Sequence, residues 1–149
     1  MLDVALARGI AYGGWCPQGG WAEDFPAPPG VLAKYPQLKE TPLADPAQRT
    51  EWNVRDADAC LIVVGAGGLE ISAGTTLAKG LAQRYGKPLF VADLREPDII
   101  ERAAPWLRTQ RATFGAGVAL AIGGPRESEA RGIYRQAISF IEALIGVIA

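Results

Sequence analysis

A glycine-rich stretch, Ala59–Thr76, carries the residue types with which many α/β proteins bind phosphate. Its continuous apolar run predicts a strand buried on both faces, and the helical spacing of apolar residues over Leu77–Tyr85 predicts a following helix. Helix N-termini present unpaired N–H groups and a positive dipole end, and glycines let a ligand approach the backbone. We therefore predict an anion-binding loop, and the alternative is a tight strand-to-helix turn without a ligand. The predicted binding residues of this loop are Gly67, Gly68, Ser72, Gly74, Thr75 and Thr76.

Two further glycine-bearing loops are expected beside the first. Gly14 follows a short predicted strand at Ile10–Tyr12, and Ser128 ends the GGPRES segment that follows a predicted strand at Gly117–Ile122. In a parallel sheet the carboxyl ends of the strands share one edge, and ligands bind outside it. Arg126 adds a guanidinium that can clamp a phosphate. Three loops at one edge favour a ligand with an anionic group.

Alternating strands and helices place these loops in one α/β domain over residues 1–149, with a parallel sheet and helices on both faces. Asp45 and Ser128 are predicted N-caps of two of the helices. Residues 19–46, rich in Pro, Gly and Trp, are predicted to be irregular, either as a lid or binding segment or as a surface excursion. The predicted strands cover residues 10–12, 59–64, 89–92 and 117–122, and the predicted helices cover 2–8, 46–58, 77–85, 97–106 with an end near Pro105, and 128–148.

Composition excludes several classes of protein. The formal net charge is −1 and 21% of the residues are charged, which argues against a nucleic-acid-binding protein with its concentrated basic face. The apolar stretches are too short for a membrane span and no signal peptide precedes the first helix, so with only Cys16 and Cys60 as cysteines we expect a cytoplasmic location. Because histidine is absent, Ser-His, Cys-His and zinc-hydrolase chemistry is not expected, and no metal site is predicted.

Several segments also carry a resemblance to a known family. They are GGWCPQGGWAEDF, YPQLKETP, QRTEWNVRDAD, SAGTT and GPRES, in this order over nearly the whole chain. The chain resembles the putative molybdenum cofactor carrier family, part of a Rossmann-like group that includes the Lonely Guy phosphoribohydrolases. The resemblance implies a Rossmann-like fold, a cytoplasmic homo-oligomer (dimer or tetramer), and binding of molybdenum cofactor, an anionic pterin with a phosphate. Molybdoenzymes would then be the recipients of the cargo.

Two departures from the family pattern bear on function. Family members begin with a strand and a Gly-Gly-Gln-Thr-Gly loop, whereas this sequence begins at Met1 within the following helix, so we expect that strand and loop to be lacking. In the phosphoribohydrolases a catalytic Glu stands two residues after a Gly-Thr pair. Here Thr76, Leu77 and Ala78 follow Gly74-Thr75, so no hydrolysis of an N-glycosidic bond is expected.

The leading hypothesis is a non-catalytic carrier of molybdenum cofactor or of a related pterin or nucleotide. The loop residues given above would hold the phosphate together with Arg126 and Ser128. Asn53 would contact the edge of the ring, and Cys16 could approach the metal as a thiolate. No catalytic residue is predicted under this hypothesis.

Two other functions compete with the carrier. The first is an enzyme acting on nucleoside monophosphates, in which Glu51, Asp56 or Glu70 would replace the missing carboxylate. The second is a scaffold that binds no small molecule. Release of free base from AMP would indicate the enzyme, and loops that bind no ligand would indicate the scaffold.

Overall fold

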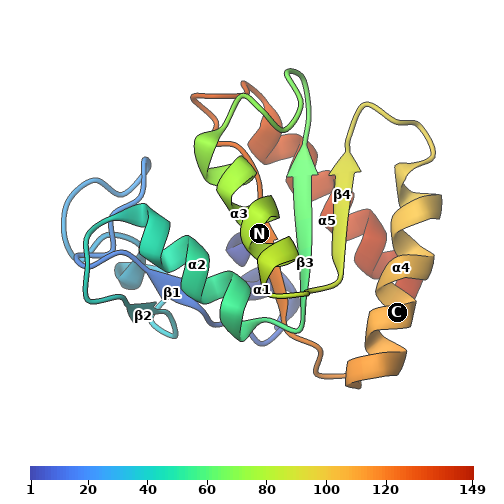
Figure 1. Cartoon of the computed structure of the whole chain (residues 1–149), viewed down its shortest axis with the longest axis horizontal. Coiled ribbons are helices and arrows are strands. Elements are labelled where there is room, and N and C mark those ends of the chain that lie inside the picture. Colours follow the sequence, from blue (N-terminus) through green and yellow to red (C-terminus); the bar gives the residue numbers. More distant parts are fainter.

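The computed structural model describes residues 1–149 and has a three-stranded parallel sheet at its centre (Figure 1). The strand order is β4-β3-β5, with β3 at Ala59–Val64, β4 at Leu89–Asp93 and β5 at Leu120–Gly123. All residues of β3 are buried, because this strand lies between the other two and helices cover both faces. The predicted central strand at Ala59–Val64 is confirmed, and the fold is the expected Rossmann-like α/β fold.

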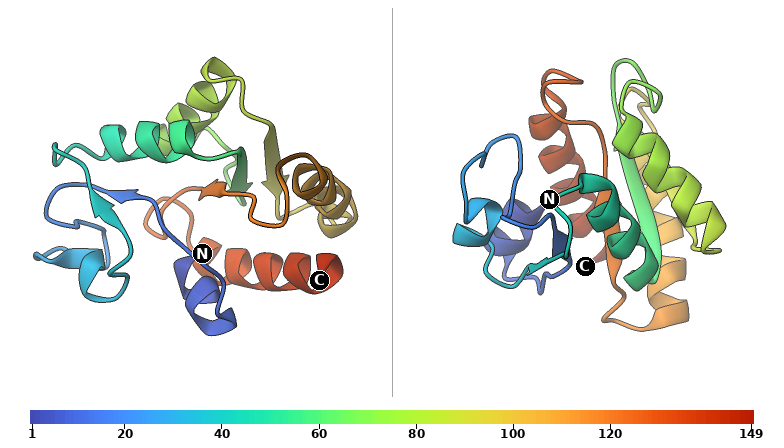
Figure 2. Two further views of the ribbon diagram at one scale, coloured as in Figure 1. Left: turned by 90° about the horizontal axis from the view of Figure 1, so that it is seen from below. Right: turned by 60° about the vertical axis from the view of Figure 1, so that its left-hand side comes forward.

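Helices lie on both faces of this sheet, as the left panel of Figure 2 shows. One face carries α2 (Pro46–Asp56) and α3 (Ala73–Arg84), which pack against each other. The other face carries α4 (Ile99–Phe114) and α5 (Ile133–Ile148), and α1 (Leu2–Arg8) packs against α5. The helices predicted at these places are present, with shifts of their ends that are described below.

Alternating residues of β3 supply two separate hydrophobic cores, because successive side chains of a strand point to opposite faces. Leu61 and Val63 belong to the larger core, with α4, α5 and Val4 of α1. Cys60 belongs to the smaller core, together with Val54 of α2 and Leu81 of α3. The apolar stripe predicted for the last helix is confirmed, since its buried residues are Ile133, Ala137, Phe140, Ile141 and Leu144.

The amino-terminal third of the chain lies outside the central sheet. A separate two-stranded parallel sheet pairs β1 (Trp15–Cys16) with β2 (Lys39–Glu40), and a short 3-10 helix, η1, covers Gly30–Ala33. The predicted strand at Ile10–Tyr12 is wrong. The hydrogen bonds from β2 go only to residues that follow Tyr12. The Lys39 N–H donates to the Gly14 carbonyl, and the Thr41 N–H donates to the Cys16 carbonyl.

Several ends of elements also differ from prediction, among them the start of α3, which lies at Ala73 instead of Leu77. The helix expected to end near Pro105 continues to Phe114 with the proline inside it. Its buried face extends past the proline to Leu107 and Gln110, and this packing outweighs the roughly 3 kcal/mol cost of a proline within a helix. The other shifts are smaller: α2 ends at Asp56, and the last strand covers Leu120–Gly123 instead of Gly117–Ile122.

The predicted N-cap role of Ser128 is wrong as well. The last helix begins at Ile133, with Gly132 as the N-cap residue. Glu127 satisfies the free amides of this helix start, because its carboxylate accepts hydrogen bonds from the N–H groups of Gly132 and Tyr134. A carboxylate at a helix N-terminus is also favoured by the helix dipole.

Candidate functional site

The carboxyl ends of the central strands meet around Gly65, directly after β3. Leu94, which follows β4, donates its N–H to the carbonyl of Val64 over 2.9 Å. Gly124, which follows β5, lies so close to β3 that a Cβ atom there would be 2.4 Å from the Val63 carbonyl oxygen. Only glycine permits this approach, so the loops after β3 and β5 share one edge as predicted.

The glycine-rich loop after β3 leads into the first turn of α3. Gly67 and Gly68 have φ of 89° and 69°, a backbone conformation that favours glycine. Ser72 is the N-cap residue of α3, and its hydroxyl accepts a hydrogen bond from the Thr75 N–H over 3.2 Å. Gly74, Thr75 and Thr76 lie in the first turn of the helix. This is the strand, loop and helix N-terminus that the sequence predicts, and whether these residues bind a ligand stays a prediction.

One hydroxyl of this helix start has no partner within the protein. Thr75 is 2% exposed, and its Oγ1 atom is buried without a hydrogen bond. Thr76, by contrast, is exposed and donates weakly to the carbonyl of Leu69 over 3.4 Å. A buried polar atom without a partner carries a free-energy cost of about 1–3 kcal/mol, so Thr75 is a candidate for contact with a bound molecule.

The loop after β5 is contacted by the irregular segment of residues 19–46. The guanidinium of Arg126 lies over the ring of Trp21, 5.4 Å from its centroid. The hydroxyl of Ser128 donates a hydrogen bond to the carboxylate of Glu23. A bound anion at Ser128 would therefore have to share this hydroxyl with Glu23, whereas the Arg126 guanidinium makes no ion pair.

A second guanidinium near Arg126 was not predicted from the sequence. Arg49 is half-buried on α2, and it makes no ion pair and no hydrogen bond with the protein. Burial lowers the pKa of Arg49, and the positive charge of Arg126 lowers this pKa further. Arginine nevertheless remains charged at neutral pH. The guanidiniums of Arg49 and Arg126, neither of which has an acidic partner, therefore repel each other. Arg49 stands four residues before Asn53 and therefore on the same face of α2. This spacing is the one sequence signal that could have identified it.

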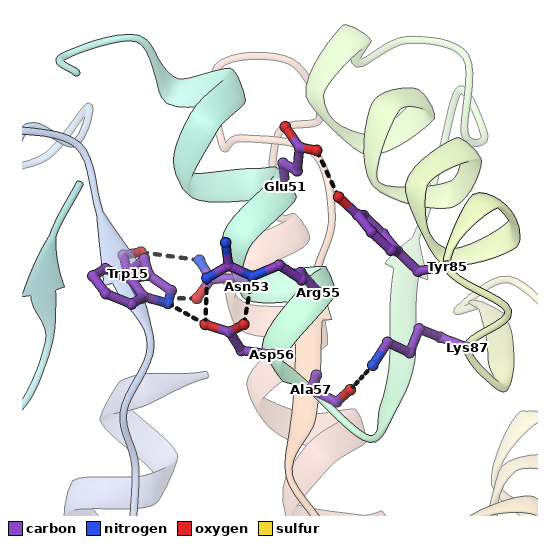
Figure 3. Close-up of polar contacts among 8 residues, drawn as sticks. All are labelled: Trp15, Glu51, Asn53, Arg55, Asp56, Ala57, Tyr85 and Lys87. Atoms are coloured by element: carbon purple, nitrogen blue, oxygen red, sulfur yellow. Dashed lines mark hydrogen bonds and ion pairs between the residues drawn. The ribbon is translucent and has the colours of Figure 1, made fainter. Parts of the chain in front are cut away.

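The remaining side chains predicted on α2 hold the helix in place, as Figure 3 shows. The Asn53 amide donates to the Trp15 carbonyl over 2.9 Å, and its oxygen accepts from the Trp15 N–H over 2.8 Å. Asp56 accepts a hydrogen bond from the Trp15 indole N–H over 2.8 Å, and Glu51 accepts one from the Tyr85 hydroxyl over 2.7 Å. A ligand contact of Asn53 stays a prediction, and its amide already fastens β1 to α2.

The first predicted glycine loop has a different position from the other two. Gly14 precedes β1 instead of following a strand, and a Cβ atom there would lie 2.6 Å from Oδ1 of Asn53. Its contacts are therefore with the middle of α2, and the expectation of three strand-following loops is wrong for this one.

Cys16 is a buried residue of β1. Burial and the nearby charge of Glu40 raise the pKa of the Cys16 thiol, while Arg49 counteracts this in part. A raised pKa favours the neutral thiol over the thiolate that binds metals. No group of three or more His, Cys, Asp or Glu side chains in the chain could hold a metal ion, and no helix is both long and apolar enough to cross a membrane.

The fold and the loops at this edge define a Rossmann-like α/β domain. The chain belongs to the family described as Circularly permutated YpsA SLOG, whose model matches residues 1–145. It is similar to the crystal structure named "Putative molybdenum carrier protein" from Syntrophus aciditrophicus SB, with a TM-score of 0.78 and 33% sequence identity. That match covers 97% of this chain and 85% of the other chain. A comparison with curated proteins gave no match. The predicted family relationship is thereby confirmed.

Proposed function

We propose that this protein binds a small molecule with a phosphate or similar oxyanion, of the molybdenum cofactor or nucleotide type, without converting it. The observation that carries this proposal is that Arg49 and Arg126 make no ion pair, while the positive charge of Arg126 acts on the half-buried Arg49 guanidinium. An anion between them would relieve their mutual repulsion and accept strong charge-assisted hydrogen bonds.

The residues at the start of α3 fit such an anion. The positive end of the helix dipole and backbone N–H groups of this loop such as that of Gly67 favour negative charge there, whereas the Gly68 N–H already donates to the Gly65 carbonyl. The Thr75 hydroxyl, buried without a partner, supplies one further donor. This donor set suits the phosphate of a pterin cofactor, and the neutral Cys16 thiol does not suit a direct bond to its metal. The similar protein of known structure described above is named "Putative molybdenum carrier protein", which supports this class of ligand.

The absence of turnover belongs to the same proposal. Glu51 and Asp56, two of the carboxylates that could replace a catalytic glutamate, are bonded to Tyr85 and to Trp15 with Arg55. Tyr85 ends α3, Trp15 lies in β1 and Arg55 in α2, so both carboxylates already have structural partners. Assembly as a dimer or tetramer, and delivery of a cargo to molybdoenzymes, are implied by the family resemblance and are part of this proposal.

Thermal denaturation tests the proposed binding directly. A ligand that binds only the folded protein stabilises it by about 2.7 kcal/mol at a concentration of 100 times Kd, which corresponds to about 8 °C for a chain of this size. We expect molybdenum cofactor or AMP to raise Tm by this order, and a phosphate-free pterin to have a much smaller effect. Arg126→Gln should reduce the shift, and Arg84→Gln, the loss of an exposed charge on α3, should not.

Two results would contradict the proposal. Equal shifts with all three compounds, or none, would show that the oxyanion does not determine binding. Release of adenine from AMP by the purified protein would show turnover and favour the enzyme. Mass spectrometry of compounds that copurify under anaerobic conditions identifies the natural ligand independently of these probes.

A further inference from the structure

An open cleft lies between the amino-terminal parts of α4 and α5, at the carboxyl end of β4. Its volume is about 490 Å³, within the range of sites for small molecules. Leu94, Ile99 and Ile100 form an apolar side, and α5 contributes the polar Gln136 and Ser139 beside Phe140. A cleft of this volume can accommodate one ring system.

This cleft reaches the start of the glycine-rich loop. A Cβ atom at Gly65 would lie 3.3 Å from Oε1 of Gln136, so the side chain that lines the cleft also touches the first residue after β3. On the other side, Leu94 lines the cleft and bonds to the Val64 carbonyl. A molecule whose phosphate lies at the start of α3 could therefore extend over Gly65 into the cleft.

The polar groups of the cleft are available for a ligand. The Gln136 amide, the Ser139 hydroxyl and the Arg135 guanidinium are exposed, and none makes a side-chain hydrogen bond or an ion pair within the protein. An amide offers both donor and acceptor, which matches the alternating donors and acceptors on the edge of a purine or pterin. The apolar wall of Ile99, Ile100 and Phe140 would cover the flat face of such a ring.

We infer that this cleft is the subsite for the ring of the ligand, a flat bicyclic nitrogen heterocycle of the purine or pterin class, with Gln136 on its polar edge. This inference rests on the proposed function, because the phosphate at α3 fixes the end of the molecule from which the ring extends. A second groove, of about 360 Å³ between α2 and α3, lies on the opposite face of the sheet, and Gly65 is not among its lining residues.

Isothermal titration with matched probes tests the ring subsite. Ribose 5-phosphate carries the phosphate without a ring, whereas AMP, GMP and 6-(phosphooxymethyl)pterin carry both. For the wild-type protein we expect at least one ring-bearing probe to bind tenfold or more tightly than ribose 5-phosphate. Ser139→Trp fills the cleft from an exposed position and should remove this advantage without changing the affinity for ribose 5-phosphate by more than twofold.

Two further variants sharpen the comparison. Gln136→Leu keeps the size of the side chain and removes its amide, and should weaken the ring-bearing probe about fivefold. Val147→Trp places the same bulky residue on the exposed surface of α5 away from the cleft and should bind every probe as the wild type does.

The outcomes separate the two proposals. If ribose 5-phosphate binds and the ring-bearing probes bind no better, or if Ser139→Trp keeps their advantage, the ring subsite is refuted while the anion site stands. If ribose 5-phosphate and all ring-bearing probes fail to bind, the proposed function is refuted, and the ring subsite with it.

Discussion

Replacement of Arg49 by methionine should stabilise the ligand-free protein and weaken anion binding at the same time. The guanidinium is half-buried, unpaired and close to Arg126, so its charge opposes folding in the absence of an anion. Two like charges at an effective dielectric constant of about 20 repel by about 4 kcal/mol at about 4 Å, and the exposure of Arg126 to solvent reduces this repulsion to on the order of 1 kcal/mol. Methionine keeps an unbranched apolar side chain in contact with its neighbours and removes the charge.

The two effects have opposite signs and can be measured separately. Loss of about 1 kcal/mol of repulsion should raise Tm of the ligand-free protein by about 3 °C. Loss of one charge-assisted hydrogen bond, about 2 kcal/mol, should weaken ribose 5-phosphate about 30-fold. Circular dichroism on heating gives the first quantity and isothermal titration gives the second.

Arg84→Met is the matched control, because it removes an exposed positive charge from α3. It should leave both quantities within error of the wild type. A lower Tm for Arg49→Met without ligand, together with unchanged affinity for ribose 5-phosphate, would refute the reasoning. Arg49 would then stabilise the fold instead of an anion.

Two further predictions concern the side chains that hold the structure together. Asn53→Ala leaves the N–H and the carbonyl of Trp15 without their partner and should lower the free energy of unfolding by about 2 kcal/mol, measured by urea denaturation; an unchanged urea midpoint with lost ribose 5-phosphate affinity would instead assign Asn53 to the ligand. Hydrogen bonds from Lys34 and Tyr134 lower the pKa of Asp3 from 3.8 to about 2, so this carboxylate stabilises the fold above pH 4 and loses that effect as the pH falls from about 4 to 2. The Tm of Asp3→Asn should therefore lie below that of the wild type at pH 7 and converge with it near pH 2, and a difference that does not change with pH would contradict this assignment.

The helical spacing over Leu77–Tyr85 predicted α3 but not its start at Ala73. The central strand could be predicted because a local signal identifies it: an uninterrupted apolar run such as Ala59–Val64 is typical of a strand buried on both faces. Asp45 is confirmed as the N-cap of α2 for the same reason, since its carboxylate accepts from the Ala47 N–H. These elements depend on residues that are neighbours in the chain.

The errors arose where distant residues decide the local structure. Tyr12 and its neighbours have strand-forming side chains, but β2 pairs only with the residues after them. Pro105 stays within α4 because the residues beyond it are buried in the larger core. Ser128 does not cap α5, because the distant Glu23 accepts the hydrogen bond of its hydroxyl and the adjacent Glu127 binds the free amides of the helix.

The candidate site likewise depends partly on local sequence signals and partly on contacts between distant residues. By itself, the sequence determined the α/β class, the glycine-rich loop after β3 and the family, because these depend on residue order and spacing along the chain. Only the tertiary structure decided that Arg49 comes close to Arg126, that Asn53 is bonded to Trp15, and that Gln136 of the last helix touches Gly65. The physical reason is that charge repulsion, hydrogen bonding and close packing act through space, between residues that are between 38 and 77 positions apart in the chain.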